Sequence, residues 1–108
     1  MRRMFERNSQ FQGDISNWDV SKVTNMNRMF RETSVFNTDI GGWQLNSLTS
    51  AQYMFDDAVS FNQDISGWTD HRNFNEVRGE YFLRNADNFQ NEEWSPFWPD
   101  CEDDKCGP

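Results

Sequence analysis

A 25-residue repeat constrains this chain more than any other feature of its sequence. Three segments follow one pattern: MFERNSQFQGDISNW at residues 4–18, MFRETSVFNTDIGGW at 29–43 and MFDDAVSFNQDISGW at 54–68. One methionine, two phenylalanines, an aspartate, an isoleucine and a tryptophan keep their places in all three without a shift in register. A period between about 20 and 50 residues is typical of proteins in which each repeat stacks on its neighbours. The sequence therefore predicts a repeat solenoid.

Composition alone would place the chain among disordered proteins. Leucine, isoleucine, valine and phenylalanine make up 21 of the 108 residues, and the formal net charge is −8. That rule leaves out five tryptophans and five methionines, most of which stand at repeat positions. Because each aromatic ring buries a large area, such rings can fill the core of a thin coil. We therefore expect one folded unit of about four coils.

Two patterns of apolar residues follow one another within each copy. Met26, Met29 and Phe30 stand at the i, i+3, i+4 spacing of a helix. The run WDV at residues 18–20 alternates with the period of two that indicates a short strand. The predicted fold is thus α/β and resembles a leucine-rich repeat. Each coil is expected to hold a short helix, a loop with a buried phenylalanine and a short parallel strand.

The pattern weakens towards the C-terminus. The third copy departs from it after Thr69, and about three residues are inserted before the fourth copy, FLRNADNF at 82–89. The aromatic stretch WSPFWP at 94–99 is expected to cover the open end of the last coil. Residues 1–99 are therefore expected to form the solenoid, and 100–108 an acidic tail. The predicted repeats are about 1–25, 26–50, 51–78 and 79–99.

The chain opens in the middle of a repeat. Met1 stands at the position of Met26, and Arg3 at that of Arg28, so no capping segment precedes the first coil. Repeat proteins need a polar cap at each end, because an open coil exposes its core to water. We therefore expect either a fragment of a longer protein or a first coil that packs on a partner. Self-association through this open coil is one form of the second.

The charge is distributed unevenly along the chain. Residues 1–35 hold six basic and four acidic residues (+2), whereas residues 36–108 hold four and fourteen (−10). Nucleic acid is not an expected partner, since phosphate binding requires a basic stripe. Head-to-tail contact between copies or docking on a basic surface is compatible with this distribution, and an acidic surface also keeps a protein in solution. No apolar run approaches the roughly 20 residues that span a membrane.

Two sets of repeated side chains are expected to form ladders. The aspartates would stack about 5 Å apart if the coils pack like strands, so their like charges must be compensated. We expect each carboxylate to accept backbone N–H groups in its own turn, and a row of bound cations is the alternative. The tryptophans are expected in the core, with ligand stacking as the alternative. The ladders are Asp14, Asp39 and Asp64, and Trp18, Trp43 and Trp68.

The outward positions of the predicted strands vary from copy to copy, while the core positions do not. We therefore expect a surface there that binds a protein, whose identity the sequence does not indicate. Its residues are Asn17, Asp19, Ser21, Gln44, Asn46, Thr69 and His71. No P-loop, nucleophile motif or glycine-rich dinucleotide turn is found, so we expect neither catalysis nor a cofactor nor a metal. Asp56 and Asp57 are expected on a solvated helix face.

Cys101 and Cys106 are the only cysteines, in the segment DCEDDKCG. An even pair in a polar tail predicts a local disulfide, which fits an oxidising compartment. A loop this short removes little chain entropy, so it would fix the tail more than stabilise the fold. A zinc site requires four ligands, and only two thiols are present, so metal binding is the less favoured alternative.

Two segments resemble the repeat of a known family: MFDDAVSFNQDISGW at residues 54–68 and WDVSKVTNMNRMF at residues 18–30. They resemble the 25-residue bacterial surface protein repeat, the BspA-like branch of the leucine-rich repeats, over about residues 1–89. This repeat is abundant in mycoplasma lipoproteins, in some surface adhesins and in proteins of marine microalgae. The resemblance implies a right-handed solenoid and a role in adhesion or protein binding. It does not imply an enzyme.

Two functions are expected from these features. The first is a non-enzymatic module for protein binding or adhesion, in a surface or extracellular protein. The second is a structural subunit that packs into a larger assembly or fibre through its uncapped first coil. A binding module is expected to be monomeric in solution, whereas an assembly subunit is expected to associate.

Overall fold

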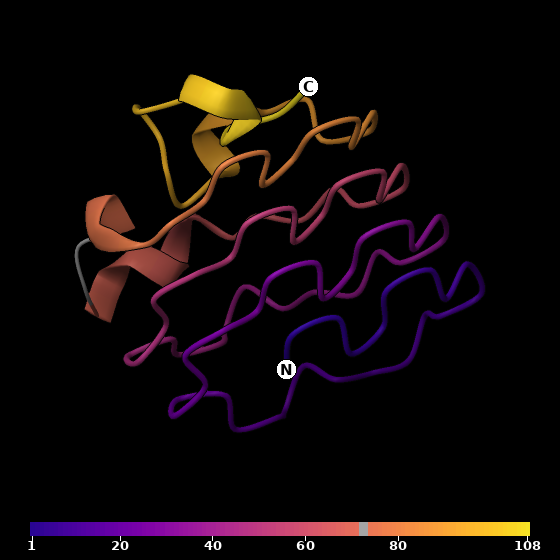
Figure 1. Cartoon of the computed structure of the whole chain (residues 1–108), viewed down its shortest axis with the longest axis horizontal. Coiled ribbons are helices and arrows are strands. Elements are labelled where there is room, and N and C mark those ends of the chain that lie inside the picture. Colours follow the sequence, from indigo (N-terminus) through magenta and orange to yellow (C-terminus); the bar gives the residue numbers. More distant parts are fainter. Residues whose placement is uncertain (72–73) are drawn as a thin grey trace.

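Successive copies of the repeat lie one above another, from the N-terminal coil to the tail that crosses the last coil (Figure 1). The computed structural model describes residues 1–71 and 74–108. Within these ranges the only helices are short 3-10 helices, and strand pairing is limited to two isolated parallel bridges, Asn25–Ser50 and Ser50–Arg78. The helices are η1 (Ser66–His71), η2 (Phe74–Glu76), η3 (Glu92–Trp94) and η4 (Glu102–Asp104).

The predicted α/β solenoid, with a helix and a strand in each coil as in leucine-rich repeats, is therefore wrong. The segments expected as helices run through consecutive tight turns, in which residues four apart have a left-handed backbone. In the second coil these are Arg28 and Glu32, both with a φ of 60°. A residue in this conformation ends an α-helix, because the next N–H group no longer points along the helix axis. The same positions of the other coils are Arg3, Arg7, Tyr53, Asp57, Tyr81 and Asn85.

Backbone N–H groups in these segments alternate between two kinds of partner. Met29 donates to the carbonyl of Met26 in its own coil at 3.2 Å and closes a turn. The next residue, Phe30, donates to the carbonyl of Met54 in the following coil at 2.8 Å. In these segments of the first three coils, successive donors are thus satisfied alternately within the coil and by the next coil. The corresponding bonds between the other coils are Phe5 to Met29 (3.0 Å) and Phe55 to Phe82 (2.9 Å).

The segments expected as strands hold two turns in succession. Trp18 donates its N–H to the Ile15 carbonyl, and Val23 donates to the Val20 carbonyl, each at 3.1 Å. Side chains rather than backbone join neighbouring coils here, since the Trp43 indole Nε1 donates to the Ile15 carbonyl at 3.1 Å. The alternation of apolar and polar residues in this segment therefore corresponds to two consecutive turns and not to a β-strand.

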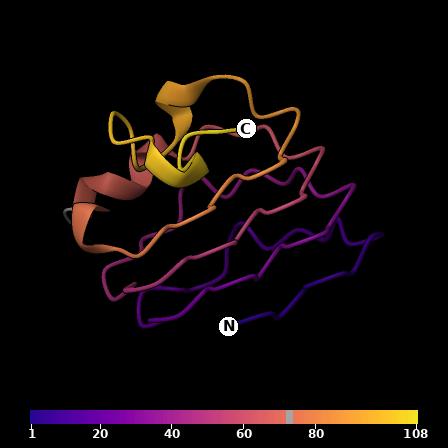
Figure 2. The same cartoon turned by 45° about the horizontal axis from the view of Figure 1, so that its top comes forward.

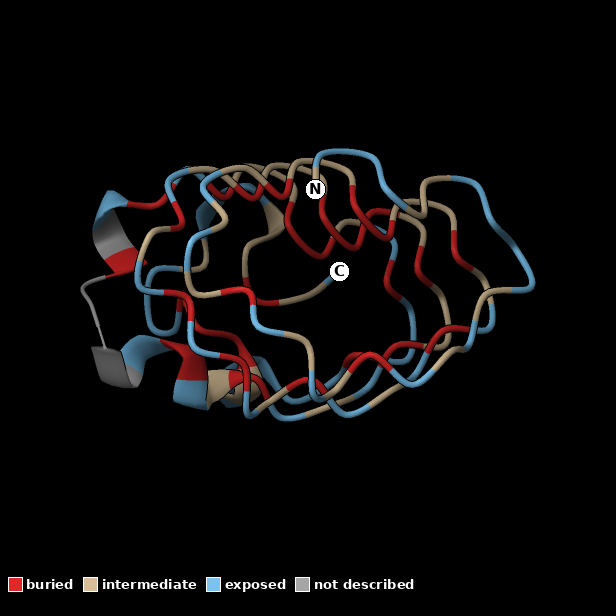
Figure 3. Cartoon of the chain, turned by 90° about the horizontal axis from the view of Figure 1, so that it is seen from below, coloured by how far each residue is buried: buried red, intermediate tan, exposed pale blue. Residues whose placement is uncertain are grey.

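The interior is filled by two columns of phenylalanine rings. One column is Phe5, Phe30 and Phe55, with ring centroids 5.7 and 5.4 Å apart. The other is Phe11, Phe36, Phe61 and Phe89, at 5.6, 5.8 and 5.9 Å. Seen along the stack, buried and exposed residues alternate around each coil (Figure 3). Because stacked rings contribute about 0.5–1.5 kcal/mol per pair beyond their burial, a core with few aliphatic residues still holds the coils together.

The C-terminal segment covers the last coil, as Figure 2 shows. The Phe97 ring packs edge-on against Phe82 and Phe74, with centroids 5.0 and 5.4 Å apart. Trp98, in the same aromatic stretch, is 44% exposed. Phe97 therefore joins the core and Trp94 packs against it, partly buried, whereas Trp98 remains largely at the surface.

Gly79→Ala is expected to displace this cap. A Cβ atom at Gly79 would lie 2.1 Å from Cζ of Phe97, so the ring must move out of its site. Overpacking of this kind costs about 1–3 kcal/mol in the free energy of unfolding, which urea denaturation would measure. Gly42→Ala is the matched control, because nothing lies within 4 Å of its added Cβ. Equal stability of the two variants would contradict a tight contact at Gly79.

Candidate functional site

The repeated aspartates are bound within their own turns. Asp14 Oδ1 accepts from the Ser16 hydroxyl at 2.7 Å and from the Ser16 N–H at 3.1 Å. These two hydrogen bonds, the hydroxyl first, hold the pKa of Asp14 below its ordinary value of 3.8. Asp39 accepts from the N–H of Gly41 at 2.9 Å, and Asp64 repeats both contacts of Asp14. For a row of cations there is no support, because no three acidic, histidine or cysteine residues in the described ranges gather as metal ligands.

Four of the seven residues expected on a binding surface line one polar hollow of about 400 Å³. They are Asn17, Asp19, Ser21 and Gln44. Asp19 is held in its turn by the hydroxyl and N–H of Ser21, at 2.7 and 3.1 Å, and these hydrogen bonds lower its pKa below 3.8. The hollow thus offers a fixed carboxylate beside amide groups, which suits hydrogen bonding to a polar ligand or peptide.

The other three predicted residues do not join this hollow. Asn46 and Thr69 are exposed but are not among its lining residues. The Thr69 hydroxyl donates to the Ser66 carbonyl at 3.0 Å, within η1. The side chain of His71 lies outside the part of the chain that the structure describes.

The repeat tryptophans differ in burial according to their place in the stack. Trp43 is 3% exposed and Trp68 is fully buried, and their rings stack 6.1 Å apart. Trp18, in the first coil, is only partly buried. The coil that precedes each tryptophan therefore determines how much of its ring is covered.

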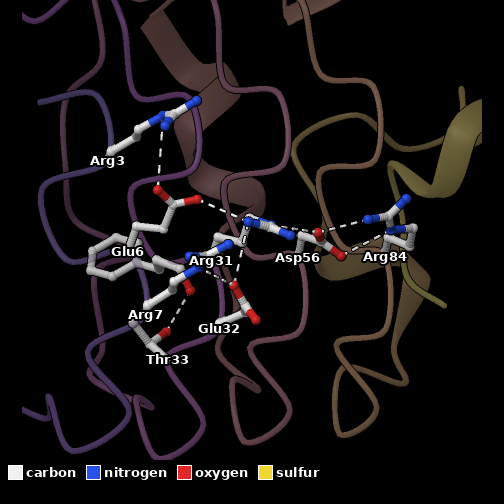
Figure 4. A network of polar contacts seen from close by, with 9 residues as sticks. Arg3, Glu6, Arg7, Arg31, Glu32, Thr33, Asp56 and Arg84 are labelled. Atoms are coloured by element: carbon white, nitrogen blue, oxygen red, sulfur yellow. Dashed lines mark hydrogen bonds and ion pairs between the residues drawn. The ribbon is translucent and has the colours of Figure 1, made fainter.

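A row of alternating charges crosses all four coils and was not expected from the sequence (Figure 4). Its members occupy the same position of successive repeats: Glu6, Arg31, Asp56 and Arg84. Asp56 is fully buried, so its expected place on a solvated helix face is wrong. Oδ2 of Asp56 lies 3.0 Å from Nε of Arg31, and its two oxygens accept from Nε and Nη2 of Arg84, each at 2.9 Å.

Arg31 is the link between the first three coils. Its Nη1 lies 3.0 Å from Oε2 of Glu6 in the first coil and 3.3 Å from Oε2 of Glu32 beside it. Hydrogen bonds to Glu6 and then to Asp56 raise the pKa of Arg31, and those to Asp56 raise that of Arg84. The alternation of sign at the repeat spacing was the signal in the sequence that could have revealed this row.

The first coil leaves one of its sides uncovered. Met4 is 51% exposed, whereas Met29 and Met54, at the same position of the next two coils, are fully buried. We call this side the N-terminal face. Its apolar side chains, all partly buried or exposed, are Met1, Met4, Phe5, Phe11, Trp18 and Val23.

The N-terminal face also carries polar groups without partners in the described part of the chain. The carbonyl groups of Arg2, Met4 and Glu6 accept no hydrogen bond there. The carbonyls at the same positions of the second coil each accept an N–H group of the first coil. The Trp18 indole N–H also has no described acceptor, whereas those of the other two repeat tryptophans donate to the preceding coil.

The opposite end of the stack is closed by the tail. Cys101 and Cys106 form the predicted disulfide, which is confirmed. The loop that it closes contains η4, and two of its carbonyls accept hydrogen bonds from the fourth coil. Tyr81 donates its N–H to Asp103 at 2.7 Å, and Leu83 donates to Asp104 at 3.0 Å. The tail thus takes the place that a following coil has elsewhere in the stack.

Removing this disulfide is expected to loosen the closed end. In Cys101→Ser/Cys106→Ser the free energy of unfolding should fall by no more than about 2 kcal/mol, because the disulfide closes only a short loop. Amide exchange at Tyr81 and Leu83 should accelerate, because their acceptors are in the loop. The Phe30 amide, bonded to Met54 in the middle of the stack, is the internal control. Unchanged exchange at the two loop-bonded amides would contradict this role of the tail.

Comparison with known proteins places the repeat in one family. A family model described as Mycoplasma protein of unknown function, DUF285, matches residues 1–96. No curated protein matches the chain, and no solved structure does. Among the helices of the described ranges, none has the length and apolar character needed to cross a membrane. The family that the comparison shows is therefore DUF285, and the match does not extend to the BspA-like branch that the sequence resembles.

Proposed function

Because the chain belongs to the DUF285 family of Mycoplasma proteins, whose function is unknown, we propose its function from its surfaces: a non-enzymatic module that binds protein. We place it in a surface or extracellular protein. The disulfide supports an oxidising compartment. The resemblance of the repeat to that of bacterial surface proteins supports a role in protein binding or adhesion.

The polar hollow is the observation that carries this proposal. Four of the seven residues expected on a binding surface line it, from the first and the second coil. The Asp19 carboxylate is held in place by the hydroxyl and N–H of Ser21, and Asn17 and Gln44 add their amide groups. Groups of this kind can form hydrogen bonds with the backbone and polar side chains of a protein partner.

A capture experiment tests the proposal. The chain is immobilised through its C-terminus and exposed to extracellular protein of the source organism, with Gln44→Glu in the hollow and Gln90→Glu, exposed in the fourth coil, as variants of equal added charge. We expect one discrete protein to be retained, with at least about tenfold less retained by Gln44→Glu, which corresponds to about 1.4 kcal/mol. Equal retention by all three chains would contradict binding through the hollow.

The alternative is a structural subunit of a larger assembly, which the unbonded carbonyls of Arg2, Met4 and Glu6 favour. Light scattering at low and high salt separates the two. A monomer at both salt concentrations supports the binding module. Association that weakens with salt indicates contact between the basic and acidic ends, and therefore a subunit.

A further inference from the structure

We propose that a small basic hollow on the side of the stack binds a phosphate group. This basic hollow has a volume of about 180 Å³ and is lined by residues at the same two positions of the first three coils. It shares no lining residue with the polar hollow of Gln44, so the inference goes beyond the proposed function. The lining residues are Arg2 and Arg3, Asn27 and Arg28, and Gln52 and Tyr53.

The basic hollow lies along the side of the stack and not at its end. The Arg3 N–H donates to the Asn27 carbonyl, and the next coil repeats this bond from Arg28 to Gln52, each at 2.9 Å. The second and third coils both have a coil on either side, and yet Arg28 and Tyr53 are only partly buried. Their exposure therefore does not depend on what precedes the first coil.

Two of the three arginines have no counter-charge. Arg3 lies 3.8 Å from Glu6, whereas no carboxylate in the described part of the chain pairs with Arg2 or Arg28. The Arg28 guanidinium lies over the Tyr53 ring, 5.1 Å from its centroid, which positions the guanidinium but adds no negative charge. Two unpaired cations thus line one small hollow of a chain whose net charge is −8, and this arrangement favours an anion.

A neutral donor is available beside the arginines. Oδ1 of Asn27 accepts from the Gln52 N–H at 2.8 Å and from the Ser50 hydroxyl at 2.6 Å, which fixes the orientation of the amide. Its NH₂ group has no acceptor among the described residues and can donate to a ligand. The Gln52 amide differs, because its Nε2 already donates to Glu80 at 2.8 Å.

Size and charge together specify the ligand. A volume of about 180 Å³ is below the roughly 300–1,000 Å³ of sites for drug-sized molecules, so the hollow holds a single group. One guanidinium can satisfy a planar carboxylate, whereas the tetrahedral oxygens of phosphate accept from several arginines at once. A phosphate ester also carries a charge of about −1.5 to −2 at neutral pH, which matches the two unpaired guanidiniums. One hollow in an acidic chain does not form the basic stripe that nucleic acid requires.

Calorimetric titration of the complete chain at constant ionic strength tests the assignment. We expect inorganic phosphate to bind saturably with a Kd of about 1 mM or lower, and acetate to bind at least about tenfold more weakly. Arg28→Gln should weaken phosphate binding at least about tenfold, and Arg28→Lys should weaken it less, because lysine keeps the charge but not the planar fork. Lys22→Gln is the matched control, since it removes one positive charge from an exposed side chain outside the hollow. It should change the Kd less than about twofold.

The remaining outcomes are equally specific. Phenyl phosphate that binds as tightly as inorganic phosphate indicates a phosphate ester on a larger molecule, and much weaker binding indicates the free ion. Equal binding of acetate and phosphate, equal effects of Arg28→Gln and Lys22→Gln, or no saturation up to about 10 mM phosphate would each overturn the assignment. If thermal melting shows that Arg28→Gln is not folded, Arg2→Gln replaces it, because Arg2 is exposed and makes no described ion pair.

Discussion

Phe55→Ala is expected to lower the free energy of unfolding by about 3–5 kcal/mol, the range for a buried phenylalanine truncated in a tightly packed core. Phe55 is fully buried. Its ring lies 5.4 Å from that of Phe30 in the preceding coil, 4.1 Å from that of Phe61 in its own coil and 5.2 Å from that of Phe82 in the following coil. Removing the ring therefore takes contacts from three coils at once. Urea denaturation would show a lower midpoint with an unchanged m-value.

Phe5→Ala is the matched control, because Phe5 has the same position in the first coil. Its ring stacks on Phe11 at 3.9 Å and on Phe30 at 5.7 Å, but no coil covers its other side. We expect about half the loss that Phe55→Ala causes, since the cavity opens to water. If both variants lost the same free energy, the N-terminal face would have to be covered in solution, and the monomeric binding module would be contradicted.

The stacking register and the core could be predicted from the sequence because both depend on period alone. A column of rings such as those of Phe30 and Phe55 forms when identical residues recur at equal spacing and each coil packs on the coil before it. The disulfide could be predicted for a similar reason, since Cys101 and Cys106 have no other cysteine as a partner. These predictions do not depend on which secondary structure carries the repeat.

The secondary structure could not be predicted because the spacing was ambiguous. Met26, Met29 and Phe30 satisfy a helix, and they equally satisfy overlapping turns that bring residues three and four apart to one side. What decides between them is the backbone of Arg28 and Glu32, which is left-handed although neither residue is glycine, asparagine or aspartate. Hydrogen bonds to the neighbouring coil compensate for this cost, and they exist only after the coils have stacked.

The candidate site was predicted only in part, because the repeat spacing indicates which positions lie side by side but not the conformation of the backbone. Asp19 and Gln44 were expected together because corresponding positions of adjacent repeats, 25 residues apart, lie side by side. The polarity of the N-terminal face was not predictable, because it follows from which backbone groups each turn leaves free. The burial of Asp56 was not predicted, because a charged residue on an assumed helix surface is expected to be exposed. Its burial is explained only by its ion-pair partners Arg31 and Arg84, which come from two other coils.

Asp56→Asn is expected to lower the free energy of unfolding by about 3 kcal/mol, the lower end of the range for breaking a buried ion pair from one side. The amide keeps the shape of the carboxylate but not its charge, so Arg84 loses a bidentate partner with both bonds at 2.9 Å. Arg31 retains Glu6 and Glu32, which limits the cost on its side. Because Asp56 is fully buried, the loss measured by urea denaturation should change little between low and high salt.

Asp57→Asn provides the matched control for the charge and for the backbone. Asp57 is the next residue, is only partly buried and has a φ of 60°, a conformation that asparagine tolerates. Its substitution removes the same charge from the same coil and should cost less than about 0.5 kcal/mol, as at most surface positions. Equal losses in the two variants would mean that net charge, rather than the row through Asp56, determines stability. A large loss confined to Asp56→Asn would instead show that the ion pairs of Asp56 with Arg31 and Arg84 stabilise the stacking of three successive coils.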